Sequence, residues 1–161
     1  MDNLEKAYFS AGCFWGVESV FSSIKGVIDT KVGYMGGNTK DPSYQEVCTG
    51  ETGHAETVMV VYNPMQVKYS ELLQNFWKCH DPTTLNRQGY DVGSQYRSAI
   101  FYTSEEQHQL AIESKDILQK KLNSQSNKTI VTFIEPEASF YLAEEYHQRY
   151  LDKKGLSSCS L

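Results

Sequence analysis

A cysteine flanked by two glycines is the residue of this sequence whose surroundings best suit covalent chemistry. Cys13 lies in the run Gly-Cys-Phe-Trp-Gly at residues 12–16, where a strand-like segment over residues 6–10 gives way to helical apolar spacing. The start of a helix carries unpaired N–H groups and a partial positive charge, so this position predicts a lowered pKa for the thiol. A cysteine can equally be a small buried apolar side chain, and the residues alone leave both interpretations open.

Two aromatic residues, Phe14 and Trp15, directly follow this cysteine. Adjacent positions on a helix point about 100° apart, so the two rings rarely serve the same surface. We expect at least one of them to enter the core. A ring that stayed beside the thiol would form an apolar wall suited to a methyl group.

A single carboxylate, Glu56, precedes the strongly apolar run of residues 57–62. A carboxyl at the edge of an apolar segment loses hydration, which raises its pKa and keeps it protonated near neutral pH. Such a group could act as a general acid. The alternative is a solvated glutamate at the start of a strand, and nothing in its local sequence excludes that.

Four cysteines occur in the chain, at positions 13, 48, 79 and 159, and none of them forms a C-x-x-C pair. A zinc ribbon or thioredoxin-like motif is therefore not indicated. Without a secretion signal we expect reduced thiols, so that any disulfide is transient and catalytic. Three histidines, His54, His80 and His147, lack the spacing of zinc ligands, and we interpret them as hydrogen-bonding supports rather than metal ligands.

The bulk composition indicates one globular domain over residues 1–161. Hydrophobic residues make up 40 % of the sequence and charged residues 22 %, a balance typical of neither disordered nor membrane proteins. The net charge of -5 argues against a nucleic-acid partner. No apolar run approaches the ~18 residues that span a bilayer, and the N-terminus lacks a secretory signal, so a cytoplasmic location is expected.

Strands and helices alternate along the chain, which favours an α/β or α+β sandwich. The expected strands cover residues 6–10, 27–34, 57–62, 99–102 and 129–134. The expected helices cover residues 14–25, 71–77, 105–122 and 143–151, with Ser70 and Ser104 as N-caps of the second and third. Two long segments, residues 35–56 and 80–97, lack clear elements. Loops beyond about 12–15 residues are uncommon in compact domains unless they are functional or disordered, so these segments are candidate parts of a site.

The run at residues 12–16 resembles the signature of the peptide methionine sulfoxide reductase A family. Further blocks that are similar to the family lie in its order along almost the whole chain. They occupy residues 33–37 (GYMGG), 44–50 (YQEVCTG), 52–56 (TGHAE), 80–84 (HDPTT), 86–98 (NRQGYDVGSQYRS) and 143–148 (AEEYHQ).

This resemblance implies a fold and an activity. The family's fold is a two-layer α/β (α+β) sandwich around a mixed sheet, related to the ferredoxin-like plait. The family reduces the S epimer of methionine sulfoxide, free or in exposed protein residues, without a metal, flavin or nucleotide. Thioredoxin or a similar dithiol is the expected reductant, and a monomer is the expected state.

The resemblance also implies roles for particular residues. Cys13 is the nucleophile that becomes a sulfenic acid, a recognised step in cysteine oxidation, and Glu56 is the acid. Tyr44 and Tyr96 donate hydrogen bonds to the sulfoxide oxygen, and Asp91 completes the polar end of the pocket.

The thiol expected to resolve the sulfenic acid is Cys159, in a tail over residues 154–161 that we expect to be mobile. Of the other two cysteines, Cys48 is expected to pack within its loop and Cys79 to be core. They are the next residues to test if Cys159 does not resolve Cys13.

Two other classes of protein remain to be weighed. A cysteine hydrolase would need a histidine within hydrogen-bond reach of Cys13 and would turn over esters or amides without a reductant. A redox switch or metal-binding module would bind metal or respond to oxidation without turnover. Neither class accounts for the tyrosine-rich loops.

Overall fold

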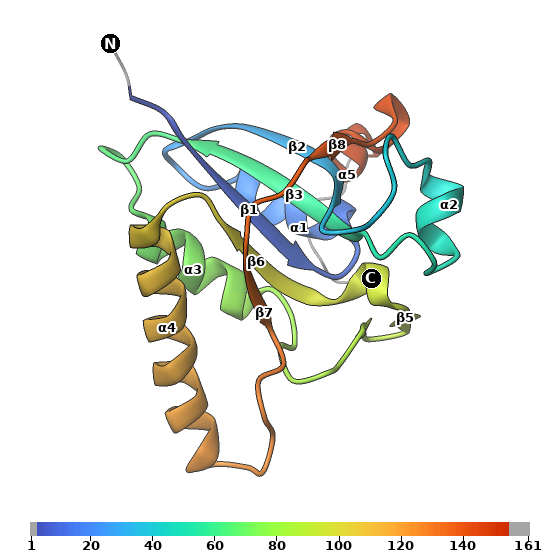
Figure 1. Ribbon diagram of the computed structural model, residues 1–161. Coiled ribbons are helices and arrows are strands. Elements are labelled where there is room, and N and C mark those ends of the chain that lie inside the picture. Colours follow the sequence, from blue (N-terminus) through green and yellow to red (C-terminus); the bar gives the residue numbers. More distant parts are fainter. Residues whose placement is uncertain (1–2, 155–161) are drawn as a thin grey trace.

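The computed structural model describes residues 3–154 and places a six-stranded sheet at the centre of the domain (Figure 1). The strand order is β7-β6-β1-β3-β2-β8; only β6 and β7 pair in parallel, so the predicted mixed sheet is confirmed. The strands are β1 (Glu5–Ala11), β2 (Val27–Met35), β3 (Ala55–Tyr62), β6 (Ser98–Tyr102), β7 (Phe133–Pro136) and β8 (Tyr141–Leu142).

Five helices accompany this sheet in the described part of the chain. They are α1 (Phe14–Ser22), α2 (Tyr44–Cys48), α3 (Tyr69–Lys78), α4 (Glu105–Asn123) and α5 (Tyr150–Lys153). Helix α1 connects β1 to β2, and α3 connects β3 to β6, which gives the β-α-β-β-α-β order of a ferredoxin-like plait. This element of the predicted fold is also confirmed. Between residues 3 and 154, no helix has both the length and the apolar character to cross a bilayer.

The main core lies between the sheet and helices α1 and α3. Side chains alternate along a strand, so Ala7 and Phe9 of β1 and Val58 and Val60 of β3 point to this side and are fully buried. The Phe9 ring stacks on aromatic rings of both helices. A smaller cluster on the opposite face is covered by the chain between β7 and β8, which crosses the strands there (Figure 1).

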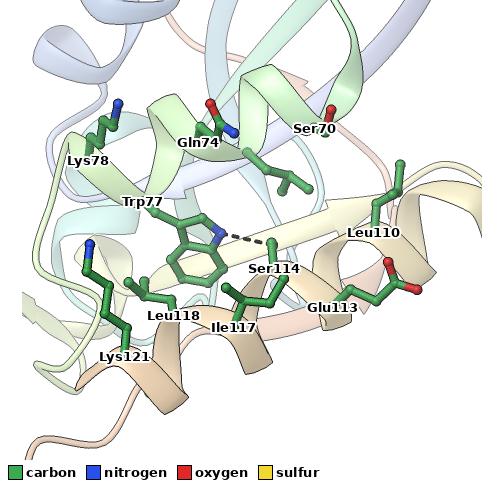
Figure 2. Close-up of a pocket in the computed structure, with 11 residues that line it drawn as sticks. Ser70, Gln74, Trp77, Lys78, Leu110, Glu113, Ser114, Ile117, Leu118 and Lys121 are labelled. Carbon is green, nitrogen blue, oxygen red and sulfur yellow. Dashed lines mark hydrogen bonds between the residues drawn. The ribbon is translucent and has the colours of Figure 1, made fainter. Parts of the chain in front are cut away.

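Helix α3 is attached to the long helix α4 through its last turn. The indole Nε1 of Trp77 donates a hydrogen bond of 3.0 Å to the hydroxyl of Ser114. Figure 2 shows this bond within a cavity of about 470 Å³ that opens between the two helices and is lined by apolar side chains such as Leu73 and Ile117. None of the residues predicted to do chemistry lines this cavity. The bond therefore fixes the end of α3 rather than forming part of a site.

Several element boundaries differ from the prediction. Helix α3 begins after Lys68, whose N–H is bonded by the Glu71 carboxylate, so Ser70 is not its cap. The prediction of Ser104 as the N-cap of α4 is confirmed by a bond from the Gln107 N–H. The strand predicted at 129–134 forms only from Phe133, because Val131 instead donates its N–H to the Pro82 carbonyl.

The two long segments contain short elements that the pattern did not predict. The first holds α2, which begins at Ser43 with a complete capping box, and the second holds the hairpin of β4 (Arg87–Gln88) and β5 (Asp91–Val92) and the 3-10 helix η1 (Ser94–Tyr96). These elements are too short to show a hydrophobic period.

The prediction of a helix over residues 143–151 is wrong. This segment forms a 3-10 turn, η2 (Glu145–His147), then extends at Gln148 before the short α5. The Gln148 side chain accepts the Val32 N–H and donates to the Val32 and Ala143 carbonyls, each at 2.9 Å. A buried amide thus satisfies backbone groups of β2, and this outweighs the helical pattern of the sequence.

Replacing Gln148 by leucine is expected to leave the Val32 N–H and the Ala143 carbonyl buried without their partners. The free energy of unfolding should fall by about 2–4 kcal/mol, measured by urea denaturation. Gln109→Leu is the matched control, because Gln109 is exposed and bonds only to a neighbouring glutamate of its own helix. An equal, small effect of both substitutions would contradict the structural role of Gln148.

Candidate active site

Cys13 lies where the sequence predicted it, between the end of β1 and the first turn of α1. It is the N-cap residue of α1, with φ -56° and ψ 120°, and its carbonyl accepts the Val17 N–H at 3.4 Å. The side chain is half-buried. This position exposes the thiol to the N–H groups at the start of the helix.

The backbone turn before Cys13 depends on Gly12. Its φ of +98° is disfavoured for residues with a Cβ, and a Cβ there would lie 2.7 Å from Cγ of Gln88. Gln88 belongs to β4 and is held by two bonds to Asp81, as acceptor from its N–H at 2.8 Å and donor to its carbonyl at 2.9 Å. The missing side chain of Gly12 therefore allows the β4–β5 hairpin to lie against the turn that carries Cys13.

Glu56 lies close to Cys13 because every second side chain of β3 points toward the core beside α1, and Glu56 is one of these residues. It shares the core-facing side of the strand with Val58 and Val60, and only 2 % of its surface is exposed. Its Oε1 accepts the Phe14 N–H at 3.1 Å, whereas Oε2 is buried and has no hydrogen-bond partner among the described residues. One carboxyl oxygen is thus held at the start of α1, and the other remains available to a ligand.

The surroundings of Glu56 favour its protonated form. Burial raises the pKa of this carboxyl to about 8 and outweighs the Phe14 N–H, which lowers the pKa; the charge of Asp91 raises it further. The raised pKa agrees with the prediction from the sequence. Since the folded-state pKa lies above its ordinary value of 4.5, the contribution of Glu56 to stability is full below pH 4.5 and is lost as the pH rises through about 8.

The predicted lowering of the Cys13 pKa is wrong. Burial, followed by the charge of Glu56, raises the pKa of this thiol to about 12, against the lowering effect of the Trp15 and Gly16 N–H groups. The sequence indicated the helix start but neither the burial of the thiol nor its proximity to a carboxylate. Protonation of Glu56 removes the charge that repels the thiolate, so the pKa of Cys13 is lower when Glu56 is a neutral acid than when it is charged, although burial still raises it.

The two tyrosines come from the two long segments and meet near Glu56. Tyr44 begins α2 and Tyr96 ends η1. Burial and the charge of Glu56 raise the pKa values of both phenols, so both keep their protons and can donate hydrogen bonds. In this structure the Tyr44 hydroxyl donates to the sulfur of Cys48.

Asp91 lies in β5 and borders the same cavity as Cys13. The volume of this cavity is about 150 Å³, and Asp91 itself is exposed. Its charge raises the pKa values of Cys13, Glu56 and Tyr96, as expected for a carboxylate near all three groups. The structure therefore brings together the thiol, both carboxyls and both phenols that the sequence singled out.

Phe14 and Trp15 both contact the ring of His147. Phe14 is 1 % exposed and Trp15 is half-buried, so one ring enters the core as predicted. Their centroids lie 5.3 and 5.6 Å from that of His147, and the Trp15 Nε1 donates to its Nδ1 at 3.0 Å. The Tyr44 ring lies 4.4 Å from the same imidazole. His147 thus links the aromatic residues of α1 to the first tyrosine.

Sequence reasoning missed Glu144 as a site residue. Its two carboxylate oxygens accept the Tyr34 hydroxyl and the Tyr44 N–H, each at 3.0 Å, which fixes the start of α2 against β2. The sequence feature that could have identified Glu144 is its place in the family-like block at residues 143–148, close to His147.

The histidines act as hydrogen-bonding supports, as predicted. His54 accepts the Gly37 N–H at 3.0 Å, and His80 contacts the Phe76 carbonyl and the Ser98 hydroxyl at 2.7 Å each. Burial lowers the pKa of His80 to about 4, so its ring is neutral near pH 7. Within residues 3–154, no group of three or more His, Cys, Asp and Glu side chains could hold a metal ion.

The remaining cysteines differ in what the structure says of them. Cys159, the predicted resolving residue, lies outside the described residues. Cys48 is exposed at the end of α2, and Cys79 is half-buried at the C-cap of α3.

Gly12→Ala is expected to destabilise the domain more than a substitution at a glycine with a similar backbone but open surroundings. Gly50 is the matched control, because its φ is +78° and nothing lies within 4 Å of a Cβ built there. Gly50→Ala should cost about 1 kcal/mol of unfolding free energy, and Gly12→Ala about 1–3 kcal/mol more because Gln88 must move. Urea denaturation checks this, and equal losses would show that the hairpin does not constrain this position.

Comparison with known proteins agrees with the geometry. The family model described as peptide methionine sulfoxide reductase matches residues 5–161. The peptide methionine sulfoxide reductase MsrA of Methanothermobacter thermautotrophicus is 56 % identical over 161 residues, covering 100 % of this chain and 94 % of that protein.

Solved structures give the same result. Methionine sulfoxide reductase A of Corynebacterium diphtheriae superposes with a TM-score of 0.92 at 42 % identity, over 99 % of this chain and 79 % of that one. Mxr1 from Saccharomyces cerevisiae in reduced form gives a TM-score of 0.87 at 42 % identity, over 94 % and 86 % of the two chains. Its complex with Trx2 gives 0.63 at 29 % identity, over 91 % and 84 %. This chain belongs to the peptide methionine sulfoxide reductase family.

Proposed function

We propose that this enzyme reduces the S epimer of methionine sulfoxide, free or protein-bound, with Cys13 as nucleophile and Glu56 as general acid. The observation that carries the proposal is the state of Glu56. Its carboxyl is buried, its pKa is raised to about 8, and Oε2 has no partner among the described residues. A neutral acid with an open oxygen next to a thiol suits a substrate whose oxygen must be protonated as its sulfur is attacked.

The first step transfers one oxygen atom. The Cys13 sulfur attacks the sulfoxide sulfur while Glu56 gives its proton to the oxygen, which then passes to Cys13. The thiol proton replaces the one that Glu56 gave up, so a thiol and a sulfoxide become a sulfenic acid and methionine. Because protonated Glu56 does not repel a thiolate, the same protonation state favours both attack and proton donation.

The other residues of the site position the substrate. The phenols of Tyr44 and Tyr96 would donate hydrogen bonds to the sulfoxide oxygen as negative charge develops on it. For Tyr44 this means exchanging the sulfur of Cys48 for the substrate. Asp91 would complete the polar end of the pocket, and the half-buried ring of Trp15 would offer an apolar wall to the methyl group, whereas the Phe14 ring belongs to the core.

The second half of the cycle returns Cys13 to its thiol. We assign this role to Cys159, whose thiol would end in a disulfide with Cys13, by condensation with the sulfenic acid and release of water or by exchange with a disulfide already formed there. Thioredoxin or a similar dithiol would then reduce the disulfide. The Trx2 complex of the yeast relative supports this choice of reductant. The proposed reaction uses no metal, flavin or nucleotide. We propose that the enzyme acts as a monomer in the cytoplasm, where thiols are kept reduced.

The proposal predicts that the protein consumes the S epimer of methionine sulfoxide, and not the R epimer, when dithiothreitol is present. Cys13→Ser should lower the rate by at least roughly 1,000-fold, because the serine hydroxyl is a far weaker nucleophile than a thiolate. The separated epimers and the methionine formed are measured by chromatography.

The control is Cys48→Ser, which leaves the proposed nucleophile and acid unchanged and should retain reduction of the S epimer. Consumption of neither epimer by the intact protein, or full activity of Cys13→Ser, would contradict the proposal.

A further inference from the structure

Two cysteines of the described chain line one cavity. Cys13 and Cys79 both border the cavity of about 150 Å³ beside the turn at Gly12. Gly16 and Val17, one helical turn beyond Cys13, form its wall on α1, and Gln88 belongs to its wall on the hairpin. The second cysteine therefore borders the same cavity as the proposed nucleophile, although the sequence separates them by 66 positions (79 minus 13).

The topology of the plait produces this arrangement. Strands β1 and β2 run in one direction and β3 and β6 in the other, because each neighbouring pair is antiparallel. Helix α1 follows β1, and α3 precedes β6. The start of α1 and the end of α3 therefore lie at the same end of the central strands. Cys13 caps the first of these helix ends and Cys79 caps the second.

The position of Cys79 is fixed by its neighbours. Its thiol donates to the Phe76 carbonyl at 3.3 Å and lies 4.0 Å from Nδ1 of His80. The Phe76 ring is fully buried, and the bond from Trp77 to Ser114 holds the same turn against α4 (Figure 2). This thiol is thus presented to the cavity by the folded body of the domain and does not depend on the C-terminal tail.

The cavity that holds Cys79 is bordered by only one of the groups assigned to the polar end of the substrate pocket. Asp91 lines it, whereas Glu56, Tyr44 and Tyr96 do not, and Cys48 does not line it either. Displacement at sulfur requires the incoming thiol to lie opposite the leaving oxygen. A sulfenic oxygen directed toward Glu56 would leave the Cys13 sulfur open to Cys79.

We infer that Cys79 is a resolving thiol built into the folded domain and that it condenses directly with the sulfenic acid of Cys13. The inference rests on the proposed function, which supplies that sulfenic acid. The Cys13–Cys79 disulfide forms as the S–O bond breaks, and the hydroxyl leaves as water with the proton of the Cys79 thiol. Cys13 is reduced and Cys79 is oxidised in this step, and an external dithiol returns both to thiols.

The test follows one turnover in the Cys159→Ser background, so that the tail cannot contribute a thiol. The protein is mixed with one equivalent of methionine S-sulfoxide without reductant, its thiols are alkylated, and disulfides are mapped by mass spectrometry. We expect one methionine per protein and a disulfide between Cys13 and Cys79. Adding Cys79→Ser should leave the yield of methionine unchanged and increase trapping of the Cys13 sulfenic acid by dimedone at least roughly tenfold.

The matched control adds Cys48→Ser instead and should still form the Cys13–Cys79 disulfide. Circular dichroism of Cys79→Ser and Cys79→Ala checks that the fold is intact, and the disulfide map itself needs no substitution at position 79. Methionine formed with Cys13 left as sulfenic acid, or paired with Cys48, would overturn the inference and leave the proposed function standing. Absence of methionine would instead refute the proposed function.

Discussion

The hydrogen bond from the Phe14 N–H to the buried carboxyl of Glu56 joins the two halves of this site. It links the core-facing side of β3 to the first turn of α1, and so places a carboxyl next to the cysteine that caps that turn. Burial makes the charged form of Glu56 unfavourable, and one N–H is too little to restore it, so the carboxyl remains protonated at neutral pH. The pKa values of Cys13, Tyr44 and Tyr96 all depend on this state.

The rest of the chain encloses this contact. The plait supplies rigid positions for Cys13 and Glu56, while the two long segments contribute the tyrosines and the hairpin with Asp91. The segment after β8 also contributes to the site. Glu144 holds the start of α2, and His147 packs against the aromatic rings at the start of α1. Residues far apart in sequence thus meet at one end of the central strands, and two long segments that contain only short elements carry much of the chemistry.

Strands and helices with a regular hydrophobic pattern could be predicted from the sequence. Contacts between residues far apart in the chain could not. The apolar run after Glu56 suggested a carboxyl with a raised pKa but left a solvated glutamate open, and the structure shows the buried group. The pKa of Cys13 was predicted in the wrong direction, because burial of the thiol, together with the charge of a carboxylate 43 positions away (56 minus 13), outweighs the N–H groups of the nearby helix. Likewise, the apolar spacing of residues 143–151 indicated a helix, but the bonds of Gln148 to β2 hold that segment extended.

The protonation state of Glu56 is the most direct test of this account. The side-chain carboxyl carbon can be labelled with ¹³C and its chemical shift followed by NMR from pH 4 to pH 10, with Glu56→Gln to assign the signal. The account predicts a midpoint near pH 8, with the neutral acid prevailing at pH 7. A midpoint near the ordinary glutamate value of 4.5 would mean that the carboxyl is ionised at neutral pH, and it would contradict both the acid role of Glu56 and its control of the Cys13 thiol.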